Sequence, residues 1–241
     1  MINAPPVGNR LLRALPDADL ARLRPLLHRV PLVAGEVLCE TDRPQHYALF
    51  PISGLIALNY VTQSGATSAV ALVGKEGFVG ISLFLSGART LVRAEVVSAG
   101  EAWRLNADDL HAQLWPGSVL QTGALHYIQA LTTQMAQTAV CNRHHSVPQQ
   151  LSRWLLLALD RCNDQDLRLT QEQMAQLLGV RREGVTEAAG KLQAQGLISY
   201  TRGLVHLVDR AGLEAHTCEC YAEVRRAYDR LLPMPLEALH D

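Results

Sequence analysis

The chain has 241 residues and a mass of 26.4 kDa, a size that allows either one or two domains. Hydrophobic residues make up 48% of it and charged residues 19%, which indicates a folded globular protein and excludes a chain that is disordered throughout. The formal net charge of −1 excludes a surface that is basic all over, so any contact with nucleic acid has to come from a local patch.

Neither the start of the chain nor its apolar runs indicate export or a membrane. The first six residues do not have the basic segment and apolar core of a secretory signal. The longest apolar run, residues 154–159, is far shorter than the roughly 20 residues that span a bilayer. We therefore expect a cytoplasmic protein with no membrane partner. The cysteines are odd in number and scattered, unlike a disulfide framework: Cys39, Cys141, Cys162, Cys218 and Cys220.

The first half of the chain has the pattern of a β-rich domain. Short strand-like runs separated by glycines occur at residues 35–38, 47–50, 55–61, 68–73, 91–97 and 101–105. Many short strands at regular spacing are typical of a sandwich or barrel. Before them, Pro16, Asp17 and Asp19 predict the start of a helix that runs to His28.

After Pro116 and Gly117 the pattern becomes helical, and Ser118 is a suitable N-cap for a long helix that reaches Asn142. Side chains along this helix follow an a/d-like rhythm with two small or polar interruptions: Leu125, Ile128, Thr132, Met135, Ala139 and Asn142. Three heptads are the lower limit for a coiled-coil seam, and they predict a homodimer. The alternative is an amphipathic helix that packs on its own β domain.

Pro148 predicts a break, because the residue before a proline disfavours helical geometry. We place a hinge at residues 142–148, a new helix at residues 149–161 and a polar loop at residues 162–166. The predicted segments are therefore residues 1–117, 118–145 and 146–241.

Residues 169–186 have the pattern of two short helices joined by a tight turn. Thr170 and Gln173 form a capping-box start, and Ala175 lets a second helix approach closely. Gly179 ends the first helix, and the second runs from about Arg181 to the residue before Gly196. This arrangement predicts a helix-turn-helix unit.

The start of the second helix carries side chains suited to reading DNA. Arg181, Arg182, Glu183 and Thr186 are expected to be exposed there, where a recognition helix meets base edges in the major groove. A following β-hairpin, centred on Arg202, predicts a wing that touches a phosphate. Residues 168–210 hold six basic and four acidic side chains, a local balance of +2. The alternative is a winged helix that makes only protein contacts.

These residues resemble the C-terminal domain of the CRP/FNR superfamily of transcription regulators. The Gly-x-x-Arg-Glu-x-Val stretch at residues 179–185 carries the resemblance, together with residues 192–198. Residues 31–38, 47–56, 77–80 and 92–94 resemble strands of the family's cyclic-nucleotide-binding-like jelly roll. The resemblance implies an α+β fold: an N-terminal jelly-roll sensor domain (1–117), a dimerisation helix and hinge (118–145), and a winged helix-turn-helix domain (146–241).

By this resemblance the chain is a homodimeric regulator that reads an inverted repeat in double-stranded DNA, with RNA polymerase as a partner and a small-molecule effector at the N-terminal domain. Arg182 and Glu183 fall on the family's base-reading Arg and Glu. Glu187 lies where one family type carries a second Arg, so the operator should differ from that type's site. The expected DNA-contacting residues are Thr170, Gln171, Arg181, Arg182, Glu183, Thr186, Glu187, Lys191 and Arg202.

The phosphate cassette departs from the family pattern. Cyclic-nucleotide binders of the family have Gly-Glu there, but Gly80 is followed by Ile81, which accepts no ribose hydrogen bond. Arg89 and Thr90 remain as candidate effector-binding residues for an anionic ligand. The alternative is that Arg89 is a solvated loop arginine.

The remaining cysteines and histidines have weak spacing signals. Only Cys39 precedes residue 140, which is too few for the four thiolates of an N-terminal iron–sulfur cluster. Cys218 and Cys220 near His216 form a weak metal pattern, and we expect ordinary helix residues there. His144 and His145 are either a pH or metal sensor or a solvated turn. The expectation is no metal and no cofactor, although a haem ligand leaves no spacing to test.

Two other classes of function compete with a DNA-binding regulator. An enzyme finds no support, because the sequence has no Gly-x-Ser-x-Gly elbow, Walker loop or His-Glu-x-x-His motif, and we expect no catalytic residues. A DNA-free sensor or protein-interaction adaptor would use the jelly roll alone. Salt-dependent DNA binding distinguishes the regulator from the adaptor.

Overall fold

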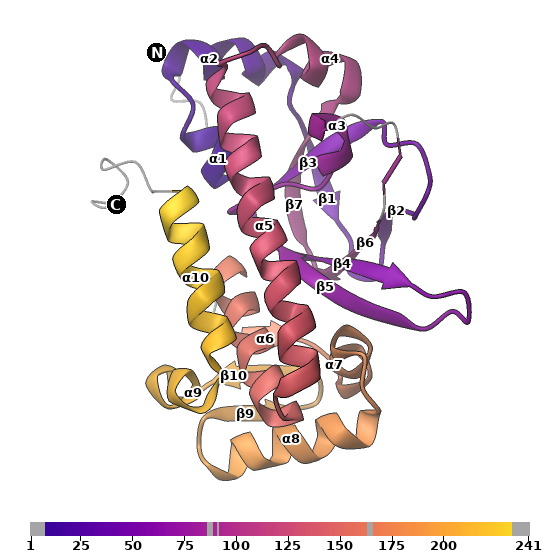
Figure 1. Cartoon of the computed structure of the whole chain (residues 1–241), viewed down its shortest axis with the longest axis vertical. Coiled ribbons are helices and arrows are strands. Elements are labelled where there is room, and N and C mark those ends of the chain that lie inside the picture. The colour runs from indigo at the N-terminus through magenta and orange to yellow at the C-terminus, as the bar shows by residue number, and fades with distance from the viewer. Residues whose placement is uncertain (1–7, 86–88, 91, 163–165, 233–241) are drawn as a thin grey trace.

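The computed structural model describes residues 8–85, 89–90, 92–162 and 166–232. Figure 1 shows a β-rich part, a long helix along its side and a helical part with a small sheet at the lower end. The predicted α+β class is therefore confirmed. Within the described residues, no helix combines the length and the apolar character needed to cross a membrane.

The N-terminal part is a pair of antiparallel sheets. Its strands are β1 (His28–Leu32), β2 (Val37–Cys39), β3 (Tyr47–Pro51), β4 (Leu55–Val61), β5 (Thr67–Val73), β6 (Arg93–Ser98) and β7 (Gly100–Asn106). One sheet has the order β1-β7-β3 and the other β2-β6-β4-β5. Short helices α1 (Arg10–Arg13), α2 (Asp17–Leu23), α3 (Ile81–Leu85) and α4 (Ala107–Ala112) complete this part. The six predicted strands are all present, within a few residues of their predicted ends.

The predicted helix from Asp17 to His28 is too long. The structure ends α2 at Leu23 and continues with a 3-10 turn, η1 (Arg24–Leu26), that contains Pro25. Proline has no N–H for the helical ladder, which explains why the helix stops there. His28 instead begins β1, where it pairs with Arg104 of β7.

Aromatic side chains join the sheets to the long helix. Phe78 packs against Phe50 and Phe84, and against Tyr127 of the long helix with ring centroids 4.8 Å apart. The backbone passes Tyr127 so closely that a Cβ at Gly77 would lie 2.0 Å from its ring. Only glycine therefore fits at this position.

The long helix, α5 (Val119–His144), begins as predicted at Ser118, whose hydroxyl accepts a hydrogen bond from the Gln121 N–H. The next helix, α6 (Val147–Cys162), starts two residues earlier than predicted. Pro148 lies in its first turn, where a missing N–H costs nothing, so the proline starts this helix instead of preceding it. Eleven of the sixteen residues of α6 are buried.

The C-terminal part contains the two short helices and a three-stranded sheet. Its elements are β8 (Asp166–Arg168), α7 (Gln171–Leu178), α8 (Arg182–Ala194), β9 (Ile198–Thr201), β10 (Leu204–Leu207), α9 (Arg210–His216) and α10 (Glu219–Leu231). The sheet order is β8-β10-β9. In the predicted polar loop, residues 163–165 lie outside the described residues, and Asp166 begins β8. Helix α10 runs back along α5 (Figure 1).

A buried ion pair fastens α6 to the jelly roll. Arg161 Nε lies 3.0 Å from Glu76 Oε1, and both side chains are almost fully buried. Arg161 also donates to the Leu72 carbonyl of β5 and to Gln134 of α5, which accepts a second hydrogen bond from Tyr228 of α10. Burial alone would lower the pKa of Arg161, but Glu76, Tyr228 and Tyr127 together outweigh this and raise it. The two halves of the chain thus share one polar anchor.

Candidate nucleic-acid interface

The α7–α8 unit has the capping and turn geometry that the sequence predicts. The Thr170 hydroxyl accepts a hydrogen bond from the Gln173 N–H, and the Gln173 side chain accepts one from the Thr170 N–H. Gly179 ends α7 in the left-handed region, at a φ of 67°. Because the Val180 N–H then donates to the Ala175 carbonyl, the turn is closed and α8 leaves in a fixed direction.

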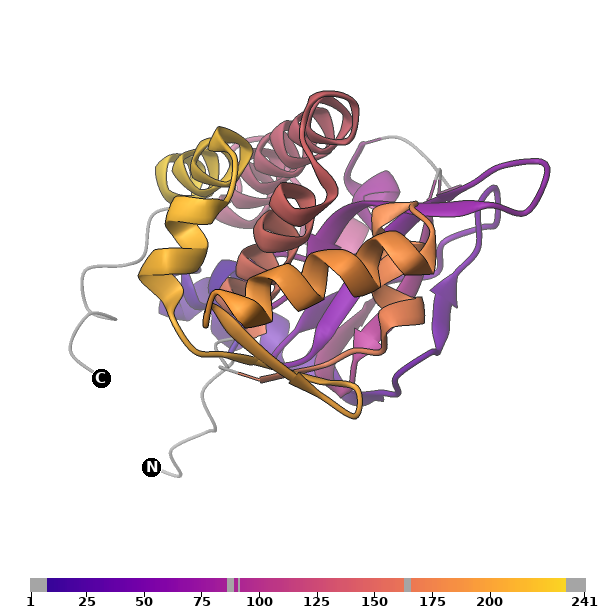
Figure 2. The same ribbon diagram turned by 90° about the horizontal axis from the view of Figure 1, so that it is seen from below.

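Helix α8 buries one face and exposes the other. Val185, Ala188, Ala189 and Leu192 pack inward, where α8 contacts α6 and α7. Figure 2 shows α8 (orange) crossing the lower end of the molecule. The predicted contact residues of this helix are all exposed: Arg182, Glu183, Thr186, Glu187 and Lys191, preceded by Arg181 at the N-cap.

Two polar contacts fix side chains on this exposed face. The Thr186 hydroxyl donates to the Gln171 side chain at 2.8 Å, so α7 and α8 are joined at the surface. Lys191 Nζ lies 2.7 Å from Glu187 Oε1, one turn away. The hydrogen bond from Lys191 lowers the pKa of Glu187, because it stabilises the carboxylate form. This pair offsets the positive charge of Lys191 in the free protein.

The hairpin of β9 and β10 forms the predicted wing. Its two central residues, Arg202 and Gly203, both have positive φ, at 50° and 79°. Positive φ at both positions is typical of the tight hairpin turn whose twist matches the strands. Arg202 is exposed at the tip, and Arg168 is exposed on the third strand of the same sheet, β8. The three-stranded sheet therefore presents two exposed arginines, one of them at the tip of the wing.

The two candidate effector residues do not point to a common ligand site. Arg89 is 62% exposed, lies 3.5 Å from the Asp42 carboxylate and donates to its backbone carbonyl. Thr90 is buried, and its hydroxyl donates to the Val92 carbonyl. Residues 86–88 and 91, which flank them, lie outside the described residues. Within the described part, both side chains already have protein partners.

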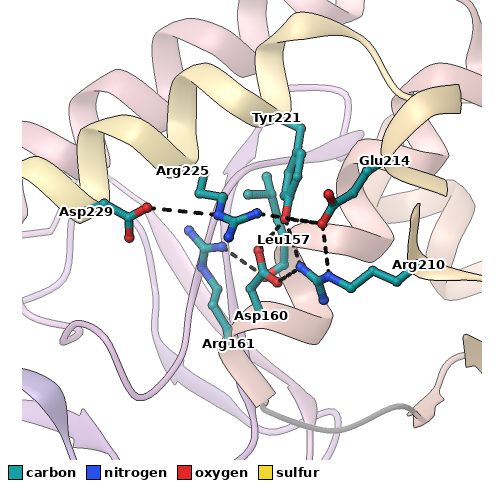
Figure 3. Close-up of polar contacts among 8 residues, drawn as sticks. All are labelled: Leu157, Asp160, Arg161, Arg210, Glu214, Tyr221, Arg225 and Asp229. Atoms are coloured by element: carbon teal, nitrogen blue, oxygen red, sulfur yellow. Dashed lines mark hydrogen bonds and ion pairs between the residues drawn. The ribbon is translucent and has the colours of Figure 1, made fainter. Parts of the chain in front are cut away.

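A cavity of about 520 Å³ lies between α6, α10 and the N-terminal part. Figure 3 shows the polar network along it. Arg210 pairs with Asp160 and Glu214, and Tyr221 donates to the Asp160 carboxylate. Arg225 joins Glu214 to Asp229. Since these charges pair with one another, we assign the network to holding α6, α9 and α10 together.

The histidine and cysteine candidates are grouped differently from the sequence pattern. His216 lies against Ser152, at 3.0 Å, and His144 is exposed. Cys218 and Cys220 lie instead beside Cys141 and His145 at the end of α5. In the sequence, Cys141 and His145 are four residues apart, which places both on one face of a helix. No nearby sequence feature indicates that residues 218–220 fold against them.

Two family descriptions match the chain, and together they cover more than half of it. Residues 29–114 match the cyclic nucleotide-binding domain, and residues 149–216 match the Crp-like helix-turn-helix domain.

The chain belongs to the CRP/FNR superfamily. It is a regulator of the CRP/FNR type, with a cyclic-nucleotide-binding-like domain and a DNA-binding helix-turn-helix domain. No curated protein sequence matches it.

Solved structures of the superfamily share its fold. FixK2 from Bradyrhizobium japonicum is 15% identical with a TM-score of 0.66, over 80% of this chain and 98% of FixK2. CLP from Xanthomonas campestris, a c-di-GMP responsive global regulator, is 17% identical with a TM-score of 0.63, over 80% of this chain and all of CLP. A CRP/FNR family regulator from Thermus thermophilus is 21% identical with a TM-score of 0.63, over 78% of this chain and 97% of that one.

Proposed function

We propose that the chain is a cytoplasmic, homodimeric, sequence-specific regulator that reads an inverted-repeat operator in the major groove. The observation that carries this proposal is the exposed first turn of α8. There Arg182 and Glu183 project from a helix whose opposite face is buried in the domain. Arg is a bidentate donor to guanine, and Glu accepts from the cytosine amino group.

The remaining contact residues divide between base edges and phosphates. Thr186, held by Gln171, lies one turn behind Arg182 on the same face. Lys191 lies two turns along α8 and Arg202 at the wing tip, so we assign both to phosphates. Thr170, Gln171, Arg181 and Glu187 complete the proposed contact set. We propose no enzymatic role and no catalytic residue, and the boundaries at residues 117 and 145 remain proposals.

The outer face of α5 supports a homodimer. Helix α10 covers one side of α5 through the contacts of Tyr228 with Tyr127 and Gln134. The predicted seam lies on exposed or half-buried positions, and Leu125 is 47% exposed. A seam along this face would place two copies of α8 about one DNA turn apart, roughly 34 Å. RNA polymerase is the proposed partner of the DNA-bound dimer.

The effector is proposed to be something other than a cyclic nucleotide. Ile81 begins α3 and supplies no acceptor for a ribose hydroxyl, and Arg89 is paired with Asp42. Losing one charge-assisted hydrogen bond weakens binding by roughly 1.5–3 kcal/mol, or about one to two decades. Calorimetry with cyclic AMP and cyclic GMP should therefore show no binding at micromolar concentration. A micromolar or tighter dissociation constant would contradict this proposal.

Sequencing of DNA fragments bound by the purified full chain tests the function. We expect an enriched inverted repeat, with an affinity for it that falls steeply as salt rises. A DNA-free sensor or adaptor would enrich no sequence and bind no DNA at low salt. That result would overturn the DNA-binding proposal.

A further inference from the structure

Four potential metal ligands meet where the end of α5 faces the start of α10. Cys141 and His145 come from the last turn of α5 and its C-cap, and Cys218 and Cys220 come from the N-cap and first turn of α10. Their ligand atoms all lie within 4.8 Å of one another. The three cysteines are buried, are not in disulfides and form a cluster separate from the main hydrophobic core.

Two distances in this cluster match the edges of a small coordination polyhedron. Cys141 Sγ lies 3.6 Å from Cys218 Sγ, and Cys220 Sγ lies 3.7 Å from His145 Nδ1. A tetrahedral ion with metal–sulfur bonds of about 2.3 Å holds neighbouring ligand atoms about 3.8 Å apart. A disulfide would need the two sulfurs at about 2.05 Å, much closer than they are.

The second nitrogen of His145 has the partner that a metal-bound histidine usually has. Nδ1 faces the sulfurs, while Nε2 lies 3.4 Å from the carboxylate of Glu219. A carboxylate on the outer nitrogen holds the proton there and leaves the inner nitrogen free to coordinate. The Glu219 side chain is 72% exposed and lies on the side of the imidazole that faces away from the sulfurs, so we do not count it as a ligand.

A buried positive charge, Arg153, lies one helical turn from Cys141. Arg153 of α6 is 2% exposed, and its Nη1 donates only to the neutral Thr138 hydroxyl. No carboxylate among the described residues pairs with it, although a buried guanidinium needs a counter-charge. Thr138 lies one helical turn before Cys141 on α5, so the Arg153 charge lies near the cluster. Three thiolates around a divalent ion carry a net charge of −1, which Arg153 would neutralise.

We propose that Cys141, His145, Cys218 and Cys220 form a Cys3His site for a structural zinc ion. Four protein ligands close the coordination sphere, as structural sites require, and sulfur with imidazole is the ligand set that zinc prefers. The N-terminus of α10 adds a partial positive charge that favours thiolates at Cys218 and Cys220. The site clamps α10 to α5 one turn before α6 and the DNA-binding domain begin.

Metal analysis of the full chain, purified under reducing conditions with zinc supplied, is the direct test. We expect about one zinc ion per chain. Cys141→Ser and Cys218→Ser should each hold less than about a tenth of that, because a serine hydroxyl is a poor zinc ligand. Cys39→Ser is the matched control, since Cys39 lies in β2 and should leave the zinc content unchanged.

Two further measurements test the site even if a cysteine variant folds poorly. Cobalt added to the metal-free chain should give the visible absorption of a tetrahedral cobalt–thiolate centre. Glu219→Gln should keep the stoichiometry but weaken zinc binding roughly 10- to 100-fold in competition with a chromophoric chelator. Glu223→Gln, an exposed acidic position on the same helix, should leave the affinity unchanged.

Several results would overturn the proposal. They are a zinc-supplied chain that holds no metal, a Cys141–Cys218 disulfide in that preparation, and cysteine variants that bind as much zinc as the parent. Iron together with acid-labile sulfide at these residues would overturn the assignment to zinc. None of these results bears on DNA binding by α8, so failure of this site and failure of the proposed function are distinguishable.

Discussion

Single side chains on the surface of α8 differ in what they already contact, and this determines how each should respond to substitution. Arg182 projects from the first turn, and Lys191 is held by Glu187 two turns further along. An exposed pair of this kind contributes little to stability. Its removal should therefore be visible mainly in DNA binding.

Arg182→Ala should cost roughly 1–3 kcal/mol on the specific site and relax the preference at one base pair. Lys191→Ala should weaken binding to specific and random DNA about equally and make the salt dependence shallower by about one unit. Titrations on operator and random DNA at several salt concentrations measure both effects. A specific-to-random affinity ratio that is untouched in Arg182→Ala would rule out α8 as the recognition helix.

At the scale of elements, the capping box at the start of α7 should contribute measurably to the stability of the fold. The Thr170 hydroxyl accepts the Gln173 N–H in the capping box. Thr170→Ala should therefore lower the free energy of unfolding by about 1 kcal/mol, while Thr170→Ser, which keeps the hydroxyl, should stay close to the parent. Denaturant unfolding of the three proteins is the measurement. Equal losses in both variants would mean that the methyl group, and not the cap, carries the effect.

The ion pair between α6 and the jelly roll gives a second prediction at this scale. Glu76→Gln should lower the free energy of unfolding by about 3–5 kcal/mol, because it leaves the Arg161 charge buried without its partner. The double variant Glu76→Leu with Arg161→Met should recover much of this loss, since it removes both charges. Urea unfolding of the single and double variants checks the prediction. A double variant less stable than Glu76→Gln would contradict it.

The elements that the sequence predicts well are those whose signals are local. Short strand-like runs between glycines predict the strands, Ser118 predicts the start of α5, and the Thr170–Gln173 pair predicts the start of α7. The prediction from Pro148 is wrong by two residues, because a residue that disfavours helix before it also suits the first turn of the next helix. The cluster around Cys141 could not be predicted, because it forms between residues 77 positions apart when α10 folds back on α5.

At the scale of the whole molecule, the outer face of α5 should decide assembly. Leu125→Arg should shift the chain toward monomer, because it buries an unpaired charge at the proposed seam. Val33→Arg is a matched control on an exposed residue outside this face. Sedimentation at micromolar concentration, with and without operator DNA, distinguishes them. A parent chain that sediments as a monomer in both conditions would contradict the dimer.

The anchor of Arg161 also limits how an effector can act. A swing of the DNA-binding domain away from its own jelly roll would pull Arg161 off Glu76 and expose the side of α6 that faces β4 and β5. If that separation costs about 3–5 kcal/mol, an effector that drives it must bind the swung state roughly 10²- to 10⁴-fold more tightly. A change in the angle between two intact protomers keeps the ion pair between Arg161 and Glu76, so the effector needs no such difference in affinity. We therefore expect an effector to change the arrangement of the two protomers, while each protomer moves as a rigid body.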